Sequence, residues 1–366
     1  MVAARTSTRS AMPESRPLGA IGVLSAENYG ERRAAIRATW LSSAPAEFVV
    51  RFVVAVNTLR GTYSECAAEQ QQHHDMVLLP SNVTSREWSP LITTFRWFEY
   101  ATTHHDTRGA EYIAKIDDDV YIHLPELALH LRLVRGREHV YYGVLYWGIY
   151  KPLHYAVVTT GRSRRAASTN AKASCPFHTC AGPFPFTTGS CQLLSGSLAK
   201  AVINATAVRK SVADAERIAC DPAHIARKKH IAYEDVWLGY AVRNLLPDRT
   251  AITVVGFDAE SYYFDKKVGD GWQLRNTTFL MHNTRKTSGR LEAAHLAMRL
   301  HCMSNASLEC GRPQMFAYSR NQTAGKGELA PVHQAGLGPS AVYTLCMVRP
   351  SRSACPGNRK RDIISQ

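Results

Sequence analysis

The sequence predicts an α/β protein, and two observations support this prediction. Apolar, β-branched segments of strand length alternate with amphipathic segments of helix length over residues 17–116. The last of these strands leads directly into three consecutive carboxylates, Asp117, Asp118 and Asp119. Ligands of open α/β sheets bind beyond the carboxyl ends of the strands, so the sequence places a candidate site at this strand end.

The predicted elements of the first half follow a regular order. In chain order they are a strand at 17–26, a helix at 31–42, strands at 47–56 and 73–80, a helix at 89–105 and a strand at 110–116. The segment EFVVRFVVAV is too rich in β-branched residues to be other than a buried strand. In the first helix, Ala35, Ile36 and Trp40 are available for one face. The order is typical of a nucleotide-binding half-domain.

The second half is less regular. Residues 153–183 are rich in Ser, Thr, Ala and basic residues, and this composition predicts a long surface loop. The segment TTGSCQLLSGSLAKAVI (187–203) predicts a glycine turn, a short strand and a helix. A second acidic pair, Glu234 and Asp235, begins a helical pattern, where acidic residues also suit the helix dipole. We expect a flexible N-terminal segment at 1–17, a single domain at 18–310 and a poorly ordered tail at 311–366.

Composition limits the class of protein. The chain has 366 residues, of which 45% are hydrophobic, enough for a sizeable core. Its formal charge of +14 raises the local concentration of anions without saying which anion binds. No zinc-finger spacing, RNP sequence or helix-turn-helix pattern is present, so nucleic acid is not an expected partner.

Sequons and cysteines point to a secretory compartment. Nine cysteines include two pairs at short spacing, Cys175 with Cys180 and Cys302 with Cys310, which disulfides could join. An odd number leaves at least one cysteine unpaired. The five Asn-X-Ser/Thr sequons begin at Asn82, Asn204, Asn276, Asn305 and Asn321.

The three consecutive Asp residues have two readings. Aspartates are common in turns, and a solvated turn explains one or two of them without any chemistry. Adjacent carboxylates repel each other, and a cation relieves that repulsion. Mg²⁺ and Mn²⁺ prefer oxygen ligands and keep positions open for water or phosphate oxygens. The residues alone leave the metal site and the solvated turn equally open.

Four motifs, taken together and in order, resemble the β1,3-glycosyltransferases of glycosyltransferase family 31. They are RRAAIRATW (32–40), YIAKIDDDVYI (112–122), PFPFTTGSCQLLS (183–195) and YEDVWLG (233–239). The resemblance covers about residues 18–300 and implies the GT-A fold, a single α/β/α domain around a mixed central sheet. It implies an inverting enzyme that moves galactose or N-acetylglucosamine from a UDP-sugar to a glycan hydroxyl, with Mn²⁺ or Mg²⁺.

The resemblance also assigns roles to individual residues. It makes Asp119 the direct metal ligand, with Asp117 facing the ribose or the metal's waters and His282 as a third ligand. Asp118 is expected on the other side of the strand exit, because successive side chains alternate there. Asp235 is the candidate general base, with Glu234 as its rival. The donor-side residues implied are Arg33, Arg37, Lys115, Asp117 and Asp118, with Arg37 the strongest of the three arginines in its motif.

The acceptor-side loop departs from the family pattern. It keeps Gly189 but has Ser190 and Cys191 where glycines are expected, a divergence similar to that of protozoan branches of the family. The resemblance further implies a glycoprotein or glycolipid acceptor and a Golgi membrane protein with a lumenal domain, whose N-terminal anchor is missing from this sequence. A catalytically inactive relative that binds glycan or UDP-sugar stays open as an alternative, although both acidic motifs are intact.

Overall fold

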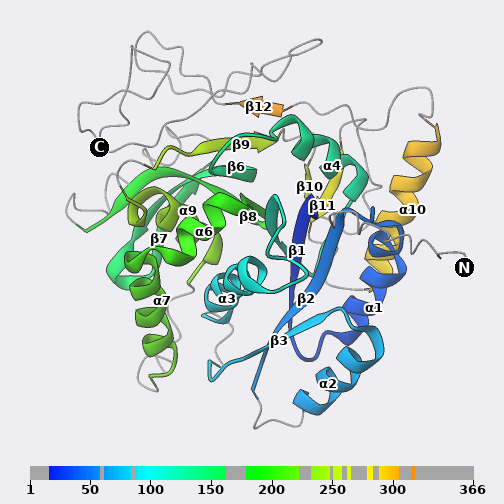
Figure 1. The fold of residues 1–366 in the computed structure, drawn as a ribbon, viewed down its shortest axis with the longest axis horizontal. Helices are drawn as coiled ribbons and strands as arrows, with labels where there is room; N and C mark the ends of the chain where they lie inside the picture. The colour runs from blue at the N-terminus through cyan, green and yellow to red at the C-terminus, as the bar shows by residue number, and fades with distance from the viewer. Residues whose placement is uncertain are drawn as a thin grey trace, which may run out of the picture.

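The computed structural model describes most of the expected domain. The described residues are 16–57, 62–83, 88–161, 179–221, 232–247, 250–257, 262–264, 278–282, 288–304 and 315–317. They form a mixed β-sheet with helices on both faces (Figure 1), so the predicted α/β/α architecture with a mixed central sheet is confirmed.

The main sheet has nine strands in the order β12-β9-β6-β8-β4-β1-β2-β3, with β7 paired to β6. Strands β4, β1, β2 and β3 run parallel, whereas β8 runs antiparallel to both β4 and β6. Its strands are β1 (Gly19–Ser25), β2 (Phe48–Val56), β3 (Met76–Pro80), β4 (Tyr112–Asp117), β6 (Val140–Lys151), β7 (Ala156–Gly161), β8 (Ala181–Ser195), β9 (Thr253–Phe257) and β12 (Met315–Ala317). A second sheet contains β10 (Tyr262–Phe264), β11 (Leu280–His282) and β5 (Val120–Ile122).

The helices divide between the two faces of the main sheet. One buried core lies under α1 (Gly30–Ala38), α4 (Leu124–Leu133) and α10 (Ser288–Ser304), and the other lies under α3 (Ser89–Thr103), α6 (Gly196–Asn204), α7 (Thr206–Ala219) and α9 (Glu234–Tyr240). The remaining helical segments are α2 (Thr62–His73), η1 (Trp40–Ser43), η2 (Pro152–His154) and the π-helical η3 (Ala241–Leu245). Ile21 of β1 packs in one core and Ala20 packs in the other, because successive side chains of a strand point to opposite faces of the sheet.

The packing of Trp97 joins α3 to the sheet. Its ring is fully buried over Gly22 of β1, and its indole N–H donates to the carbonyl of Ala114 on β4 at 2.8 Å. Because the ring fills the space where a β-carbon of residue 22 would lie, only glycine lets the helix approach this closely.

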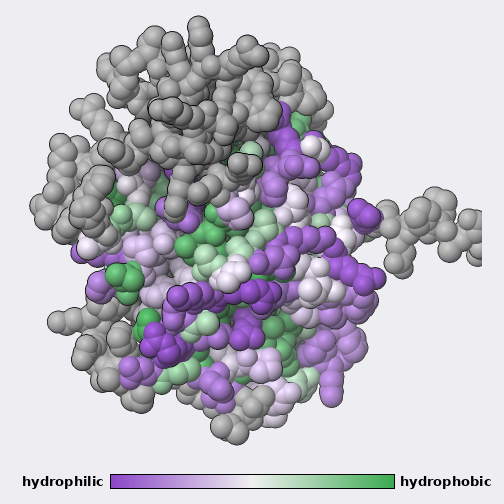
Figure 2. Space-filling view, turned by 60° about the vertical axis from the view of Figure 1, so that its left-hand side comes forward, coloured by the Kyte–Doolittle hydropathy of each residue, from purple (hydrophilic) through white to green (hydrophobic). Residues whose placement is uncertain are grey.

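The surface shows no single dominant apolar area on the described part of one face. Figure 2 shows small apolar areas on that face, separated by a band of hydrophilic residues. No helix among the described residues combines the length and the apolarity that crossing a bilayer would require.

The structure adds elements that the sequence did not predict. Helix α2 buries only Cys66 and is polar on its other sides, so it lacks the apolar period that identifies a helix. Within the predicted loop at 153–183, β7 pairs with β6 and β8 already begins, while 162–178 lie outside the described residues. Within the predicted tail, β12 pairs with β9.

The structure gives the bonding state of four of the nine cysteines. Cys180 is disulfide-bonded, and its predicted partner Cys175 lies outside the described residues. Cys66, Cys191 and Cys220 are free thiols.

The Trp97 contact predicts the effect of Gly22→Ala. The new methyl group would meet the indole at 2.6 Å, and the ring cannot withdraw without breaking its hydrogen bond to β4. We expect a loss of about 1–3 kcal/mol in the free energy of unfolding, as for other overpacked cores. Urea denaturation followed by fluorescence measures it. Gly289→Ala is the control, because nothing lies within 4 Å of its added carbon, and it should not lower the free energy of unfolding. Equal effects of the two changes would contradict the packing argument.

Candidate active site

The acidic run lies at the carboxyl end of β4, where the chain turns sharply into β5. Asp117 is the last residue of β4, and Asp118 and Asp119 form the turn. Strand β11 pairs antiparallel with β5 so that His282 stands opposite Val120. A histidine more than 160 positions further along the chain is thereby placed beside the acidic turn.

Asp117, Asp119 and His282 form a group that could hold a metal ion. His282 Nε2 lies 3.5 Å from Asp119 Oδ1 and 4.0 Å from Asp117 Oδ2, and one ligand atom from each residue lies within 4.8 Å of the others. Two carboxylates and an imidazole suit divalent ions that also take water or phosphate oxygens. The chemistry of the donor set therefore fits the predicted metal.

Asp118 is held away from this group. Its Oδ2 accepts from Ser25 Oγ at 2.8 Å, and its Oδ1 accepts from Arg32 Nη1 at 2.9 Å. Burial raises the pKa of Asp118, against the opposing effects of Arg32 and of the Ser25 hydrogen bond. Asp118 thus fixes the acidic turn to the end of β1 and to α1, and its donor-side role stays a prediction.

Lys115 lies fully buried beneath the acidic turn. Its ammonium donates to Asp117 Oδ1 at 2.6 Å, to the carbonyl of Gly189 at 3.0 Å and to Glu234 Oε1 at 2.8 Å. Burial acts to lower the pKa of Lys115, but the charges of Asp117 and Glu234 outweigh it and raise that pKa. All three N–H bonds are engaged within the protein, and the donor-side role of Lys115 stays a prediction. Its contacts give it a positioning role.

Gly189 reaches Lys115 because β8 bulges at this point. Gln192 pairs with Gly143 of β6 and Thr187 pairs with Leu145, so residues 188–191 face a single residue of β6. A β-carbon on Gly189 would meet Glu234 Oε1 at 2.6 Å, Lys115 Nζ at 3.0 Å and Asp117 Oδ2 at 3.1 Å. Any side chain at this position would collide with the charged cluster.

The predicted acceptor-side loop is therefore part of a strand. Gly189 and Ser190 belong to β8, and the Ser190 side chain is buried, with its hydroxyl 2.8 Å from Thr188 Oγ1. In this structure Gly189 supports the charged cluster, and Ser190 offers no exposed surface to an acceptor.

The second acidic pair stands at the first turn of α9. Lys115 binds Glu234, whereas Asp235 Oδ1 accepts from the backbone N–H of Val236 at 2.7 Å. Burial, followed by the charge of Glu234, raises the pKa of Asp235 to about 7. Burial also raises the pKa of Asp117 to about 6, although Lys115 opposes it. A carboxyl group with a pKa near neutrality is suited to accept a proton.

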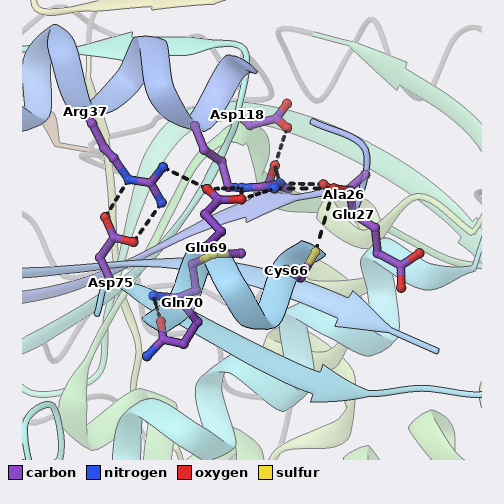
Figure 3. A network of polar contacts seen from close by, with 11 residues as sticks. Ala26, Glu27, Arg37, Cys66, Glu69, Gln70, Asp75 and Asp118 are labelled. Atoms are coloured by element: carbon purple, nitrogen blue, oxygen red, sulfur yellow. Dashed lines mark hydrogen bonds and ion pairs between the residues drawn. The ribbon is translucent and has the colours of Figure 1, made fainter. Parts of the chain in front are cut away.

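The arginines of the first motif take part in a network between α1, α2 and β3 (Figure 3). Arg33 is buried and binds Glu69, with Nε at 2.9 Å and Nη2 at 2.6 Å. Arg37 binds both oxygens of Asp75 at 2.8 Å and also pairs with Glu69. These contacts account for both guanidinium groups, so their binding to a donor stays a prediction. Arg32 is the arginine of this motif that contacts the acidic turn.

A cavity of about 560 Å³ lies beside this network, at the carboxyl end of β1. Glu27 stands on its wall and accepts from the Asn57 N–H at 3.0 Å and from Thr62 Oγ1 at 2.8 Å. Burial raises the pKa of Glu69, but the hydrogen bonds from Arg33 and Arg37 lower it below its usual value overall. Neither Glu27 nor Glu69 was predicted from the sequence. Glu69 was missed because the helix that carries it was not predicted. The cavity is lined by Glu27, Asn28, Tyr29, Gly30, Glu31, Arg32, Arg33, Glu65, Cys66 and Glu69.

Comparison with known proteins identifies the family of this chain. The profile of the galactosyltransferase family matches residues 31–216. The chain is 31% identical over 170 residues to mouse beta-1,3-galactosyltransferase 6, an alignment that covers 43% of this chain and 48% of that protein. It is 29% identical over 119 residues to zebrafish lactosylceramide 1,3-N-acetyl-beta-D-glucosaminyltransferase A, covering 30% of each. The aligned part thus spans at most about half of these relatives.

Among solved structures, the galactosyltransferase LgtC in complex with donor and acceptor sugar analogs superimposes with a TM-score of 0.37 at 10% identity. The superposition covers 72% of this chain and 86% of LgtC. At this level of similarity LgtC says nothing about individual residues of the site.

The raised pKa of Asp235 predicts a pH-dependent effect of Asp235→Asn on stability. Between its usual value of 3.8 and about 7, the unfolded chain loses this proton while the folded protein keeps it. The carboxyl group therefore destabilises the fold as the pH rises, and the destabilisation is complete above about pH 7. An amide carries no such penalty. We expect Asp235→Asn to melt at least about 2 °C higher at pH 8 and at the same temperature near pH 4.

Thermal denaturation in the presence of a chelator measures this difference. Asp214→Asn is the matched control, because Asp214 lies exposed on α7 beside Arg217, where surface pairs contribute little. A melting temperature of Asp235→Asn equal to that of the unmodified protein at pH 8 would contradict the buried environment of this carboxyl group.

Proposed function

This chain belongs to the galactosyltransferase family, and from that premise we propose that it transfers a hexose from a UDP-sugar to a glycan hydroxyl, forming a β1,3 linkage with inversion. One observation supports the proposal above all. The buried ammonium of Lys115 donates both to Asp117, one of three residues that could hold a metal ion, and to Glu234, whose neighbour Asp235 has a raised pKa. Inverting transfer of a sugar from a nucleotide diphosphate can use both a metal ion and such a carboxyl group.

The leaving-group side is assigned to Asp117, Asp119 and His282. These residues would hold Mn²⁺ or Mg²⁺, which supplies Lewis-acid stabilisation of the negative charge that develops on the β-phosphate. Lys115 keeps Asp117 oriented, and Ser25 and Arg32 keep the turn in place through Asp118. The carboxylates are thus positioned before any donor binds, as electrostatic catalysis requires.

The proton-accepting side is assigned to Asp235. Inversion requires the acceptor hydroxyl to attack from the face opposite the leaving group, with a base to take its proton. Glu234 is the weaker candidate, because its Oε1 is bound by Lys115. Asp235 is free of that contact, and its pKa near 7 suits transfer of a proton at neutral pH.

Further parts of the proposal rest on the family. The donor is UDP-galactose or UDP-N-acetylglucosamine, and the acceptor is a glycan of a glycoprotein or glycolipid. The sequons support a lumenal catalytic domain, which we place at the Golgi membrane through an N-terminal anchor.

Release of UDP by the purified protein tests the function. With Mn²⁺ and a panel of UDP-sugars, we expect release with one donor and loss of that release on chelation. Asp119→Ala removes a ligand and Asp235→Ala removes the base, and each should lower the rate by roughly 10²–10⁴-fold. Asp214→Asn should leave it unchanged. Release that survives Asp235→Ala would reassign the base to Glu234 or indicate retention. A folded protein that binds UDP but releases none from any donor would favour the inactive relative.

Gly189→Ala tests whether the charged cluster is as tightly packed as its contacts indicate. The added methyl group must displace Glu234, Lys115 or Asp117, and displacement of groups that orient metal ligands typically costs about 10–100-fold in metal affinity or activity. We expect kcat to fall by that factor with Mn²⁺ affinity reduced. Gly289→Ala provides the control. An unchanged rate would show that the cluster tolerates movement.

A further inference from the structure

A second cavity lies at the amino end of the central strands, away from the acidic turn. Tyr112 begins β4 and pairs with Gly19 of β1 on one side and with Ser195 of β8 on the other. A cavity of about 560 Å³ opens beside these residues. Five residue steps along β4, about 17 Å at the rise of a strand, separate Tyr112 from Asp117. We call this the amino-edge cavity.

Cations dominate the lining of the amino-edge cavity. Arg16, Arg108, Arg137 and Lys200 come from four separate segments of the chain and meet there. One carboxylate, Glu111, also lines the cavity, but Arg135 binds it, with Nε 2.7 Å from Oε2. The local charge therefore stays strongly positive after that pair is formed.

Three of these cations differ from most other arginines in the described residues. Eight arginines elsewhere in the described part of the chain pair with carboxylates, namely Arg32, Arg33, Arg37, Arg51, Arg96, Arg132, Arg209 and Arg217. Within those same ranges, Arg16, Arg108 and Lys200 form no ion pair. Cations gathered in one cavity without enough carboxylates to neutralise them form a site that favours an anion.

Arg137 is the most enclosed of the four. Burial lowers its pKa, and the charge of Tyr112 opposes this effect. Gly136, immediately before it, has φ +81°, a left-handed conformation that glycine adopts readily, and the chain turns there.

The first turn of α6 borders the cavity but does not account for its charge. Ser195 already caps this helix, since its Oγ accepts from the Leu198 N–H at 3.3 Å and from the Val140 N–H at 3.0 Å. Ser197 Oγ accepts from the His139 N–H at 3.2 Å. The attraction for an anion thus comes from the four side-chain cations.

We propose that the amino-edge cavity binds a tetrahedral dianion, a phosphate or sulfate group carried by a small molecule or a glycan. Several guanidinium forks around one volume match a group that has three or more acceptor oxygens and more than one charge. A single carboxylate would leave most of these donors unused. The site does not depend on the proposed transfer reaction, because it lies at the other end of the sheet.

The test compares two double variants that remove the same charge. Arg108→Ala with Lys200→Ala removes two cations from the cavity. Arg96→Ala with Arg209→Ala removes two exposed cations that pair with Glu216 and Glu99. Binding of inorganic phosphate to the full chain is measured by calorimetry at low ionic strength with a chelator present. We expect the cavity variant to bind phosphate about tenfold or more weakly and the control variant to bind within about twofold of the original.

Two further arms identify the source of the anion and the integrity of the fold. A sugar phosphate and a sulfated disaccharide are compared as probes, and the tighter one names the group that the cavity prefers. Binding of UDP in the presence of Mn²⁺ should be equal in the two variants, which separates this site from the acidic turn and shows that both fold. Equal loss of phosphate affinity in the two variants, or no saturable phosphate binding to the unmodified protein, would overturn the proposal.

Discussion

The buried ammonium of Lys115 is the interaction on which the arrangement of the acidic site depends. It bonds to the end of β4 through Asp117, to the bulge of β8 through Gly189 and to the first turn of α9 through Glu234. Without it, two carboxylates would lie close together with no cation between them, an arrangement that costs several kcal/mol in a protein interior. The sheet, the bulge and the helix are therefore held in one geometry by electrostatics as well as by packing. The absence of a side chain at Gly189 is what lets the three come together.

The same contacts give five neighbouring carboxyl groups different properties. Arg32 and Ser25 bind Asp118, and Lys115 binds Glu234. The carboxylates of Asp118 and Glu234 are therefore occupied by contacts within the protein. Asp117 and Asp119 keep oxygens directed toward His282. Burial, followed by the charge of Glu234, raises the pKa of Asp235 to about 7, against the opposing effects of the Val236 N–H and Lys115. Where environments separate the pKa values of adjacent acids, acid and base roles can be assigned. The assignment of Asp235 as base follows from how its neighbours are neutralised.

The sequence predicted those features that depend on local pattern. Runs of β-branched residues identified β1, β2 and β4, and the four motifs identified the family, which the profile match confirms. Features that depend on distant pairing were less accessible. Nothing local indicates that β8 bulges beside Lys115, because a glycine between polar residues also predicts a loop. The contacts of Arg37 were equally hidden, since Glu69 lies on a polar helix without an apolar period.

Among the described residues, the two ends of the central strands differ in how charge is neutralised. At the carboxyl end, arginines and Lys115 pair with carboxylates inside the protein. Their charge is thereby neutralised, and the ion pairs stabilise the positions of α1, α2 and α9. At the amino end, Arg16, Arg108 and Lys200 have no such partners among the described residues. An unpaired cation costs nothing in packing while it stays hydrated, yet it attracts anions over a Debye length, about 8 Å at physiological ionic strength. The unpaired cations at the amino end therefore favour anions at this edge of the sheet.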